Sequence, residues 1–400
     1  TTKKCHNEHC GRLANLMSIR VATLNVWSLP AGLAKHKPQR MRAIYERVAE
    51  LNLDVVAFQE IWTQESLDAL VAGAKRAGFE HTWHNPEPAS GSGLLVVSKL
   101  PIVKTHFEAF KAKGHPERLN HFDYYSGKGI ALVTVEAPFG AVTLLNTHLH
   151  ANYASTQSLD EYKGIRAVQV LQLVASVAKL RTPLIALGDF NLEETETSYR
   201  VLLGLSGLRD TAVDLGVVQP TWISESPYKT VGQSDKRIDY IFCRDGSQQG
   251  IEPRKMSREF AEALDFDGVA GGYSDHAGLV AEFAPVPARA VTHPDHDAAL
   301  ALAAGLLDEG RAIATQRQFD QRLTSGGALA VGIATYNTAR FAAQNRRRFL
   351  KNVLGFASSA SFAILAGNLA LSEWINPKEV AVYDHAEQQL ARIQADLRRN

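Results

Sequence analysis

Runs of apolar residues along the first 283 positions alternate between strand-like and helix-like spacing. Residues 19–26 alternate apolar and polar positions as a strand does, and residues 37–51 place apolar side chains at helical spacing. The continuous apolar run at 53–58 is typical of a strand that is buried on both faces. Another helix is predicted at 162–180, and further strands are predicted at 94–98, 129–135, 141–146, 183–188, 237–243 and 278–283. This order predicts a sheet-rich α/β domain.

The pattern changes beyond this region. Residues 285–296 contain three prolines and predict a linker, whereas residues 297–400 are rich in alanine and contain no strand-like run. We therefore expect an N-terminal tail at 1–18, a main domain at 19–284 and a helical region at 297–400. No charged segment followed by an apolar one opens the sequence, so we expect a secretory signal to be absent or already removed.

Composition limits the classes of function. Hydrophobic residues make up 45% and charged residues 21% of the 400 positions, which is ordinary for a folded protein. The net charge of +1 does not suggest a dedicated nucleic-acid partner. Three cysteines cannot form a disulfide framework and favour a reducing compartment. The segment from Cys5 to Cys10 is too short to wrap a metal tetrahedrally, and we do not predict a zinc site there.

Most predicted strands of the main domain end or begin near a polar residue that could bind a metal or a phosphate. Each residue alone has an ordinary explanation as a helix cap, a turn former or a buried histidine. Together they form an ordered set: Asn25, Gln59-Glu60, Asn146-Thr147-His148, Asp189-Phe190-Asn191, Asp239 and Ser274-Asp275-His276.

In order and strand-end placement, this set resembles the endonuclease/exonuclease/phosphatase superfamily, whose marks are N, QE, TH, GDFN, RIDY and SDH. The resemblance implies a four-layer α/β/β/α sandwich of the DNase I-like kind with a C-terminal α-helical region added. It also implies hydrolysis of a phosphate ester, which needs a cation, a base for the attacking water and a group that stabilises developing charge.

Residue types suggest how these tasks are divided. Glu60 offers a hard oxygen ligand for Mg²⁺, with Mn²⁺ as a possible substitute, and Asn25 and Asp275 are expected on the same metal side. Asp189 is the candidate to activate water, and Asn191 and His148 are expected near the phosphate. A charged His276 would stabilise developing negative charge, with Asp239 orienting it.

Other stretches resemble the neutral sphingomyelinases within that superfamily, namely residues 24–30, 35–42, 91–102 and 147–151. Residues 123–129 are similar to the loop in which that family places an Asp and a Lys that switch the site between inactive and active arrangements. The resemblance therefore adds Asp123 and Lys128 to the candidate catalytic residues. The alternative is a solvated loop with a local Asp–Lys pair.

The resemblance implies cleavage of sphingomyelin to ceramide and phosphocholine. Because aromatic faces bind quaternary ammonium groups, Trp27, Trp62, Tyr124 and Tyr125 are candidate choline contacts, although core packing is an alternative for each.

The helical region has two charge-free stretches, 323–339 and 352–372, that are close to the length needed to cross a bilayer. Members of the neutral sphingomyelinase family that this sequence resembles carry two C-terminal transmembrane helices, so the resemblance implies two such helices here. However, Ser, Thr, Asn and Gly are frequent here, and Arg346-Arg347-Arg348 between the stretches oppose the positive-inside rule. A soluble or interfacial hairpin is therefore an alternative. Residues 380–399 predict an amphipathic closing helix.

We thus predict a Mg²⁺-dependent sphingomyelin phosphodiesterase that acts on phospholipid at a membrane surface, with its catalytic domain in the cytosol. The alternatives are a phospholipase C for choline lysophospholipids, a nuclease of the same superfamily and a non-catalytic membrane scaffold. The sequence leaves the oligomeric state open.

Overall fold

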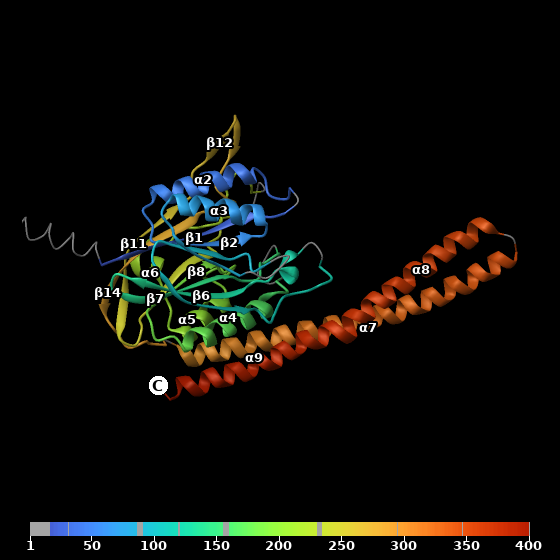
Figure 1. The fold of residues 1–400 in the computed structure, drawn as a ribbon. Coiled ribbons are helices and arrows are strands. Elements are labelled where there is room, and N and C mark those ends of the chain that lie inside the picture. The colour runs from blue at the N-terminus through green and yellow to red at the C-terminus, as the bar shows by residue number, and fades with distance from the viewer. Residues whose placement is uncertain are drawn as a thin grey trace, which may run out of the picture.

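The computed structural model describes residues 17–30, 32–85, 91–118, 121–154, 160–229, 234–293, 295–345 and 347–399. Two six-stranded mixed sheets pack against each other between outer layers of helices, as Figure 1 shows. The predicted four-layer sandwich with an added C-terminal helical region is therefore confirmed. The segment from Cys5 to Cys10 lies outside the described residues.

The first sheet surrounds the parallel pair β1 and β2. Helices α2 (Lys37–Glu50) and α3 (Gln64–Arg76) cover its outer face, and the apolar residues Met41, Ile44 and Val48 of α2 are buried there. In spatial order the strands are β11 (Gln249–Glu259), β14 (Gly278–Pro287), β1 (Ile19–Ser28), β2 (Val55–Ile61), β4 (Leu95–Ser98) and β3 (His81–His84).

The second sheet surrounds the parallel pair β7 and β8. Helices α4 (Lys163–Ala178) and α5 (Thr197–Ser206) cover its outer face. In spatial order its strands are β5 (Ile102–Ala109), β6 (Gly129–Ala137), β7 (Gly140–His148), β8 (Leu184–Asp189), β10 (Asp239–Arg244) and β9 (Arg209–Asp210). The smaller elements are the 3₁₀ turn η1 (Phe122–Tyr125), helix α6 (Thr211–Leu215) and the hairpin of β12 (Leu264–Phe266) and β13 (Val269–Gly271).

Side chains that alternate along the strands fill the space between the sheets. Val21 and Val55 from the first sheet meet Leu144 and Ile185 from the second, and all four are fully buried. Removing this much apolar surface from water is the main favourable contribution to the stability of the sandwich.

Strand β14 extends to Pro287, within the segment predicted to be a linker. Pro287 pairs with Gln249 of β11, whereas the pairing of β14 with β1 ends at Phe283. A proline is tolerated at such a place because one side of the strand no longer has a neighbour that needs its N–H group. The predicted start of the linker at 285 is therefore wrong.

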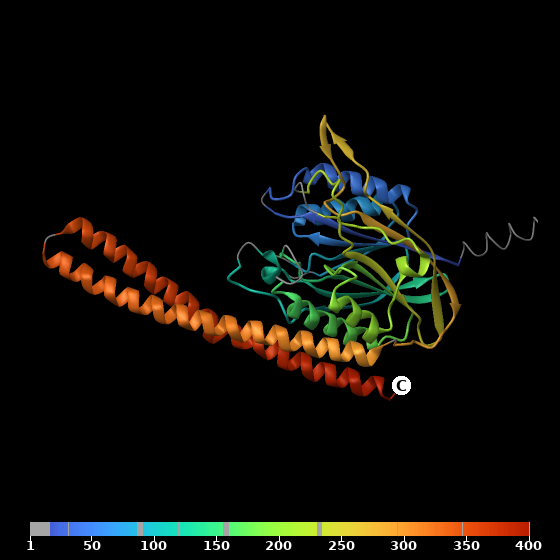
Figure 2. The same cartoon turned by 180° about the vertical axis from the view of Figure 1, so that it is seen from behind.

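The C-terminal region consists of three long helical elements: α7 (His296–Gln344), α8 (Arg348–Ala370) and, after the π-helical turn η3 (Leu371–Ile375), α9 (Asn376–Leu397). Figures 1 and 2 show that the later part of α7 and α8 project from the sandwich as a hairpin, whereas the start of α7 and α9 lie against α4 and α5.

The base of these helices belongs to the core of the main domain. Ala303 and Leu307 of α7 and Tyr383 and Ala386 of α9 are buried in the same cluster as Leu171 of α4. The amphipathic face predicted at 380–399 therefore packs on the catalytic domain. The helical region predicted at 297–400 is therefore packed on the main domain, because the outer face of α4 is apolar and needs this cover.

Within the described part of the chain, one continuous helical stretch, Arg348–Leu397, is long and apolar enough to cross a membrane. It contains the predicted charge-free stretch 352–372. The other stretch, 323–339, lies in α7 and is not part of it.

Candidate active site

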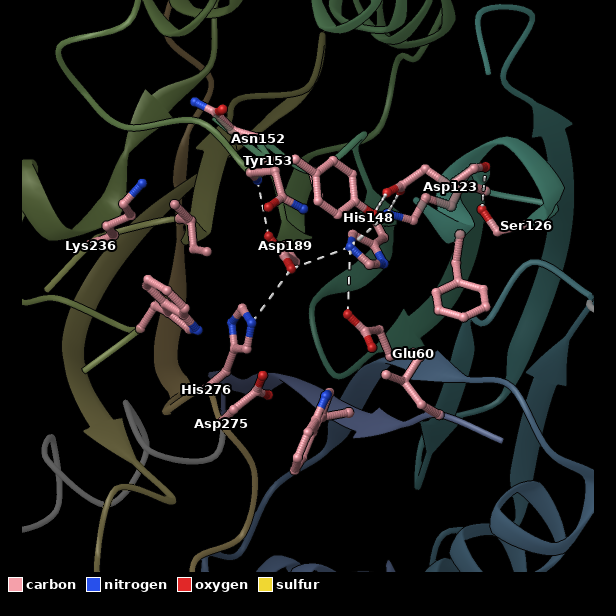
Figure 3. A pocket seen from close by; sticks show the side chains of 18 of the residues that line it. Glu60, Asp123, Ser126, His148, Asn152, Tyr153, Asp189, Lys236, Asp275 and His276 are labelled. Atoms are coloured by element: carbon pink, nitrogen blue, oxygen red, sulfur yellow. Dashed lines mark hydrogen bonds and ion pairs between the residues drawn. The ribbon is translucent and has the colours of Figure 1, made fainter. Parts of the chain in front are cut away.

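Strand direction brings six of the predicted residues together. The parallel pairs β1–β2 and β7–β8 end at one edge of the sandwich, and β10 and β14 begin at that edge because they run antiparallel to β8 and β1. The carboxyl ends of β1, β2, β7 and β8 and the amino ends of β10 and β14 therefore contribute to one pocket, and Figure 3 shows several of these side chains converging there. The six residues are Asn25, Glu60, His148, Asp189, Asp239 and His276.

Asn25 connects the two sheets at this edge. Its Nδ2 donates hydrogen bonds to Glu60 Oε1 and Asp189 Oδ2, each at 2.9 Å, and its Oδ1 accepts one from the Trp27 N–H at 3.0 Å. Both polar atoms of this fully buried amide are satisfied, which fixes its orientation and holds the two carboxylates at a set separation.

The backbone is strained around these side chains. Trp27, Glu60 and Asn191 have φ values of 45°, 60° and 48°, in the left-handed region that residues other than glycine seldom occupy. Such strain persists only where the surrounding structure enforces it, and it concentrates at functional sites.

His148 faces both carboxylates. Its Nε2 lies 3.4 Å from Asp189 Oδ2 and 3.9 Å from Glu60 Oε1, and the Lys128 ammonium is 2.9 Å from the same nitrogen. Burial, together with the nearby charge of Lys128, holds the pKa of His148 well below its usual range. His148 is therefore neutral, and its Nε2 accepts a hydrogen bond from Lys128.

His276, in contrast to the neutral His148, is protonated. Its Nδ1 donates to Asp239 Oδ2 at 2.9 Å, and its Nε2 lies 4.0 Å from Asp189 Oδ2. Burial lowers the pKa of His276, but the carboxylates of Asp239 and Asp275 outweigh this effect and hold it well above its usual range. Burial and the charge of Asp239 raise the pKa of Asp189 to about 7.

The loop from Asp123 to Lys128 reaches into the same pocket. The two side chains form an ion pair, and Lys128 also donates to the Leu149 carbonyl oxygen at 3.0 Å. Burial raises the pKa of Asp123, but Lys128 outweighs it and the pKa lies well below its usual range. Both side chains are buried, so the alternative of a solvated Asp–Lys pair is wrong.

Two groups of three side chains in the described residues could hold a metal ion: Glu60, His148 and Asp189, and Asp189, Asp239 and His276. Of the predicted metal ligands, Glu60 belongs to the first group, and Asn25 donates a hydrogen bond to the carboxylate of Glu60. Asp275 is in neither group, but it lines the same pocket. Burial is the main cause that raises the pKa of Glu60, and the nearby charge of Asp275 raises it further. The site thus offers oxygen and nitrogen donors to a divalent cation.

The pocket has a volume of about 350 Å³. Among the predicted aromatic contacts, Trp27 and Trp62 line it, whereas Tyr124 and Tyr125 are not among its lining residues. Asn191 lines it as well, with its backbone N–H donating to Asp189 Oδ1 at 3.0 Å.

Sequence reasoning missed several other lining residues. Trp222, Lys236 and Tyr153 lie outside every motif and reach the pocket from loops. Glu193 and Glu196 follow Asn191 closely, and that proximity could have suggested them. Glu196 is paired with the fully buried Arg166, with an Oε2–Nη2 distance of 2.9 Å.

The fold, the convergent strand ends and the acidic pocket together define a phosphoester-hydrolase type of site. Residues 22–276 match the model of the Endonuclease/Exonuclease/phosphatase family, and the chain belongs to that family.

Two curated relatives are more specific. A Drosophila melanogaster protein assigned by name to the neutral sphingomyelinases is 31% identical over 275 residues, which cover 67% of this chain and 61% of that protein. The Inositol phosphosphingolipids phospholipase C of Schizosaccharomyces pombe is 28% identical over 234 residues, which cover 55% of this chain and 51% of that protein. The match thus spans between half and two thirds of the length of these relatives.

Among solved structures, a beta toxin variant from Staphylococcus aureus with bound magnesium ions is similar, with a TM-score of 0.51 and 20% identity. The match covers 66% of this chain and 99% of the toxin. At this identity the likeness establishes the shared fold.

Proposed function

We propose that this chain is a divalent-metal-dependent phosphodiesterase that hydrolyses sphingomyelin to ceramide and phosphocholine. The observation that carries the proposal is the position of Asp189, whose Oδ2 is bonded to Asn25, lies 3.4 Å from His148 and lies 4.0 Å from His276. A carboxylate held among groups that could bind a phosphate and a metal ion is well placed to accept a proton from an attacking water.

Mg²⁺ is the proposed cofactor, with Mn²⁺ as a substitute, and Glu60, Asn25 and Asp275 are its proposed ligands. Glu60 and Asp275 are partly buried, and this burial raises the pKa of each. A cation would relieve this concentration of negative charge, and Mg²⁺ prefers such hard oxygen donors. When bound, the ion neutralises charge on the phosphate and on the leaving oxygen.

Asp189 is the proposed base. Its carboxylate takes the proton of the attacking water, the water oxygen bonds to phosphorus, and the bond from phosphorus to the ceramide oxygen breaks. The departing ceramide oxygen takes up one proton from solvent, and Asp189 later returns the proton of the water to solvent. A pKa near neutrality suits this proton transfer at physiological pH. Asn191 orients the water or a phosphate oxygen beside it.

Cationic and neutral donors complete the site. Protonated His276, oriented by Asp239, stabilises the charge that develops on the phosphate. His148 contributes a neutral imidazole, and Lys128 moves from Asp123 toward a phosphate oxygen. A positive charge aimed at the transition state lowers the barrier more than one aimed at the substrate.

Trp27 and Trp62 are the proposed contacts for the choline group, because both line the pocket and present aromatic faces. The identity of the headgroup is tested by comparing several substrates. The relevant assay measures water-soluble products from sphingomyelin, phosphatidylcholine, lysophosphatidylcholine, an inositol phosphosphingolipid and single-stranded DNA, with Mg²⁺ and with EDTA. Release of phosphocholine from sphingomyelin in Mg²⁺ alone is expected, and preferential cleavage of DNA would favour the nuclease alternative.

We also propose that the hairpin of α7 and α8 inserts into a membrane. Small side chains occupy the seam between its helices: Ser325, Gly332, Ala339 and Ser358 are buried, and Ser358 Oγ donates to the Gly332 carbonyl oxygen at 3.1 Å. Large apolar side chains point outward instead, including Leu323, Val331, Phe341, Phe349, Phe356 and Ile364. A hairpin in water buries its large apolar residues, whereas close packing of small residues with large ones outside suits a lipid environment.

The hairpin and the rim of the pocket face the same way. Figures 1 and 2 show the hairpin leaving the domain on the side where the 3₁₀ turn η1 lies, and Arg317 of α7 bonds Glu117 just before that turn, with an Nη2–Oε1 distance of 2.6 Å. Phe122 in η1 is an exposed apolar residue at this rim. This arrangement supports a pose in which a bilayer held by the hairpin meets the pocket.

A further inference from the structure

Two side chains hold Asp123 at the same time. Its carboxylate forms the ion pair with Lys128, and its Oδ2 accepts a hydrogen bond from the Tyr153 hydroxyl. Because Asp123 is only 5% exposed, bulk water cannot replace a lost partner at small cost.

Under the proposed function, Lys128 must leave this arrangement. In the structure its Nζ contacts Asp123, His148 Nε2 and the Leu149 carbonyl oxygen. A shift of the ammonium toward a phosphate oxygen lengthens its contact with Asp123. If Lys128 were the only partner, the shift would leave a buried unpaired carboxylate, which strongly disfavours the move.

Tyr153 keeps its place independently of Lys128. Its ring stacks on that of His121, with centroids 3.9 Å apart and planes 3° from parallel. His121 Nδ1 in turn lies 2.6 Å from the hydroxyl of Tyr162, which is buried at the start of α4. The Tyr153 hydroxyl is therefore supported from the helical layer. It bonds Asp123 Oδ2, whereas Lys128 contacts Oδ1, and Figure 3 shows Tyr153 beside Asp123.

We infer that Tyr153 is a positioning residue for the reaction, which retains Asp123 by a hydrogen bond while Lys128 moves onto the phosphate. This inference rests on the proposed function, since it assigns a partner to the step in which Lys128 leaves Asp123. In this role Tyr153 acts through Asp123.

The test is a double-mutant cycle of Tyr153→Phe and Asp123→Asn. The phenylalanine keeps the ring that stacks on His121 and removes only the hydroxyl. One hydrogen bond to a buried charged group corresponds to a rate loss of about 10- to 100-fold. We expect Tyr153→Phe to lower kcat by this factor with KM changed less than about twofold, the mark of an interaction that matters in the transition state. In the Asp123→Asn background, the same change should lower kcat by less than about twofold.

The matched control is Tyr199→Phe. Tyr199 donates to the carboxylate of Asp210 at 2.7 Å in another buried part of the protein that does not line the pocket. Its removal should lower thermal stability and leave kcat unchanged. A similar fall of kcat in both tyrosine variants would show a general packing effect and would overturn the inference.

Two substrates separate the possible outcomes, sphingomyelin in detergent micelles and the soluble diester bis(p-nitrophenyl) phosphate. A role through Asp123 predicts the same fold-loss on both, whereas a loss confined to sphingomyelin would mean that Tyr153 binds the headgroup, which contradicts the inference. Full activity of Tyr153→Phe, or multiplicative losses in the cycle, would also overturn it. Hydrolysis of the soluble diester without hydrolysis of sphingomyelin would show that sphingomyelin is not the substrate. The double-mutant cycle, measured on the soluble diester, would still decide whether Tyr153 acts through Asp123.

Discussion

His276 and Asp239 are joined by a single buried hydrogen bond, from His276 Nδ1 to Asp239 Oδ2 at 2.9 Å. Asp239 is the first residue of β10 and His276 precedes β14, so the bond connects the two sheets. It turns the other ring nitrogen of His276 toward Asp189 and favours the charged imidazolium. The proposed role of His276 in stabilising charge on the phosphate therefore depends on Asp239, which is not among the residues that line the pocket.

Replacement of Asp239 tests this dependence. Asp239→Asn keeps the shape of the side chain but removes the charge that stabilises protonated His276, and we expect kcat to fall by about 100-fold or more. His276→Ala should cause a loss of similar size, and the double variant should be no slower than the worse single variant, because the two residues act as a unit. Losses that multiply in steady-state kinetics would show independent roles.

Glu60 and Asp189 are expected to act by different means. Glu60→Gln should lower the affinity for Mg²⁺, so titration with the metal should recover part of the rate. Asp189→Asn removes the base, and no concentration of Mg²⁺ should restore turnover. The measurement is initial rate against Mg²⁺ concentration, with circular dichroism to verify that both variants are folded. Wild-type rates in both variants at saturating metal would contradict the site assignment.

The sequence was informative where a residue's neighbours are set by strand direction. Asn25, Glu60, His148 and Asp189 follow apolar strands, and a layered sheet brings such ends together whatever the details of packing. Strands β5 and β11 were missed because exposed polar residues such as Lys104 and Lys255 interrupt their alternation. Helix α3 was missed as well, although its N-cap Thr63 accepts a hydrogen bond from the Ser66 N–H.

Contacts made by loops and helix ends could not be predicted, because no pattern in the sequence indicates them. Tyr153 bonds Asp123 across 30 positions with no motif around it. The attachment of α7 depends on Gly164 of α4, where an added Cβ would lie 2.5 Å from the Cα of Gly310. Close contact of two glycines on different helices cannot be inferred from helical periodicity, so the sequence did not predict that the helical region packs on the main domain.

Removal of only the projecting hairpin should separate membrane binding from catalysis. Arg322 and Glu373 form an ion pair across its base, with an Nε–Oε1 distance of 2.7 Å, so a short Gly-Ser turn can replace residues 324–371 without touching the buried parts of α7 and α9. We expect hydrolysis of detergent-dispersed sphingomyelin within about twofold of wild type, and much lower activity on vesicles because tethering raises the effective substrate concentration.

Vesicle flotation provides the direct comparison. Wild-type protein should float with phosphatidylcholine–sphingomyelin vesicles, and the shortened variant should remain at the bottom of the gradient. A variant truncated after Pro287 serves as a contrast, because it exposes the core around Leu307 and Tyr383 and should aggregate. Equal flotation of wild-type and shortened proteins would reject membrane insertion by the hairpin.

His115 should make the fold sensitive to mild acid. Burial, and then the charge of Arg317, lower its pKa to about 2, and neither ring nitrogen has a hydrogen-bond partner among the described residues. The folded state keeps His115 neutral, whereas the unfolded chain binds a proton below a pH of about 6.5. Protonation of His115 therefore favours the unfolded chain below that pH and has no effect above it. The free energy of unfolding should fall as the pH falls, by about 2 kcal/mol at pH 5.

His115→Phe should remove this sensitivity. The difference in unfolding free energy between pH 8 and pH 5, from urea titrations, should be smaller in His115→Phe than in wild type by about one proton's linkage. The exposed His84 of β3 offers a control, and His84→Gln should leave the difference unchanged. An unchanged difference in His115→Phe would mean that His115 becomes protonated in the folded protein.

The central claim is that a water activated at Asp189 attacks the phosphorus of sphingomyelin. Hydrolysis in H₂¹⁸O with Mg²⁺, followed by mass spectrometry of both products, tests it most directly. The account predicts one ¹⁸O atom in phosphocholine, none in ceramide and no phosphocholine from Asp189→Asn. Label in the ceramide hydroxyl, or labelled phosphocholine formed at the wild-type rate by Asp189→Asn, would contradict it.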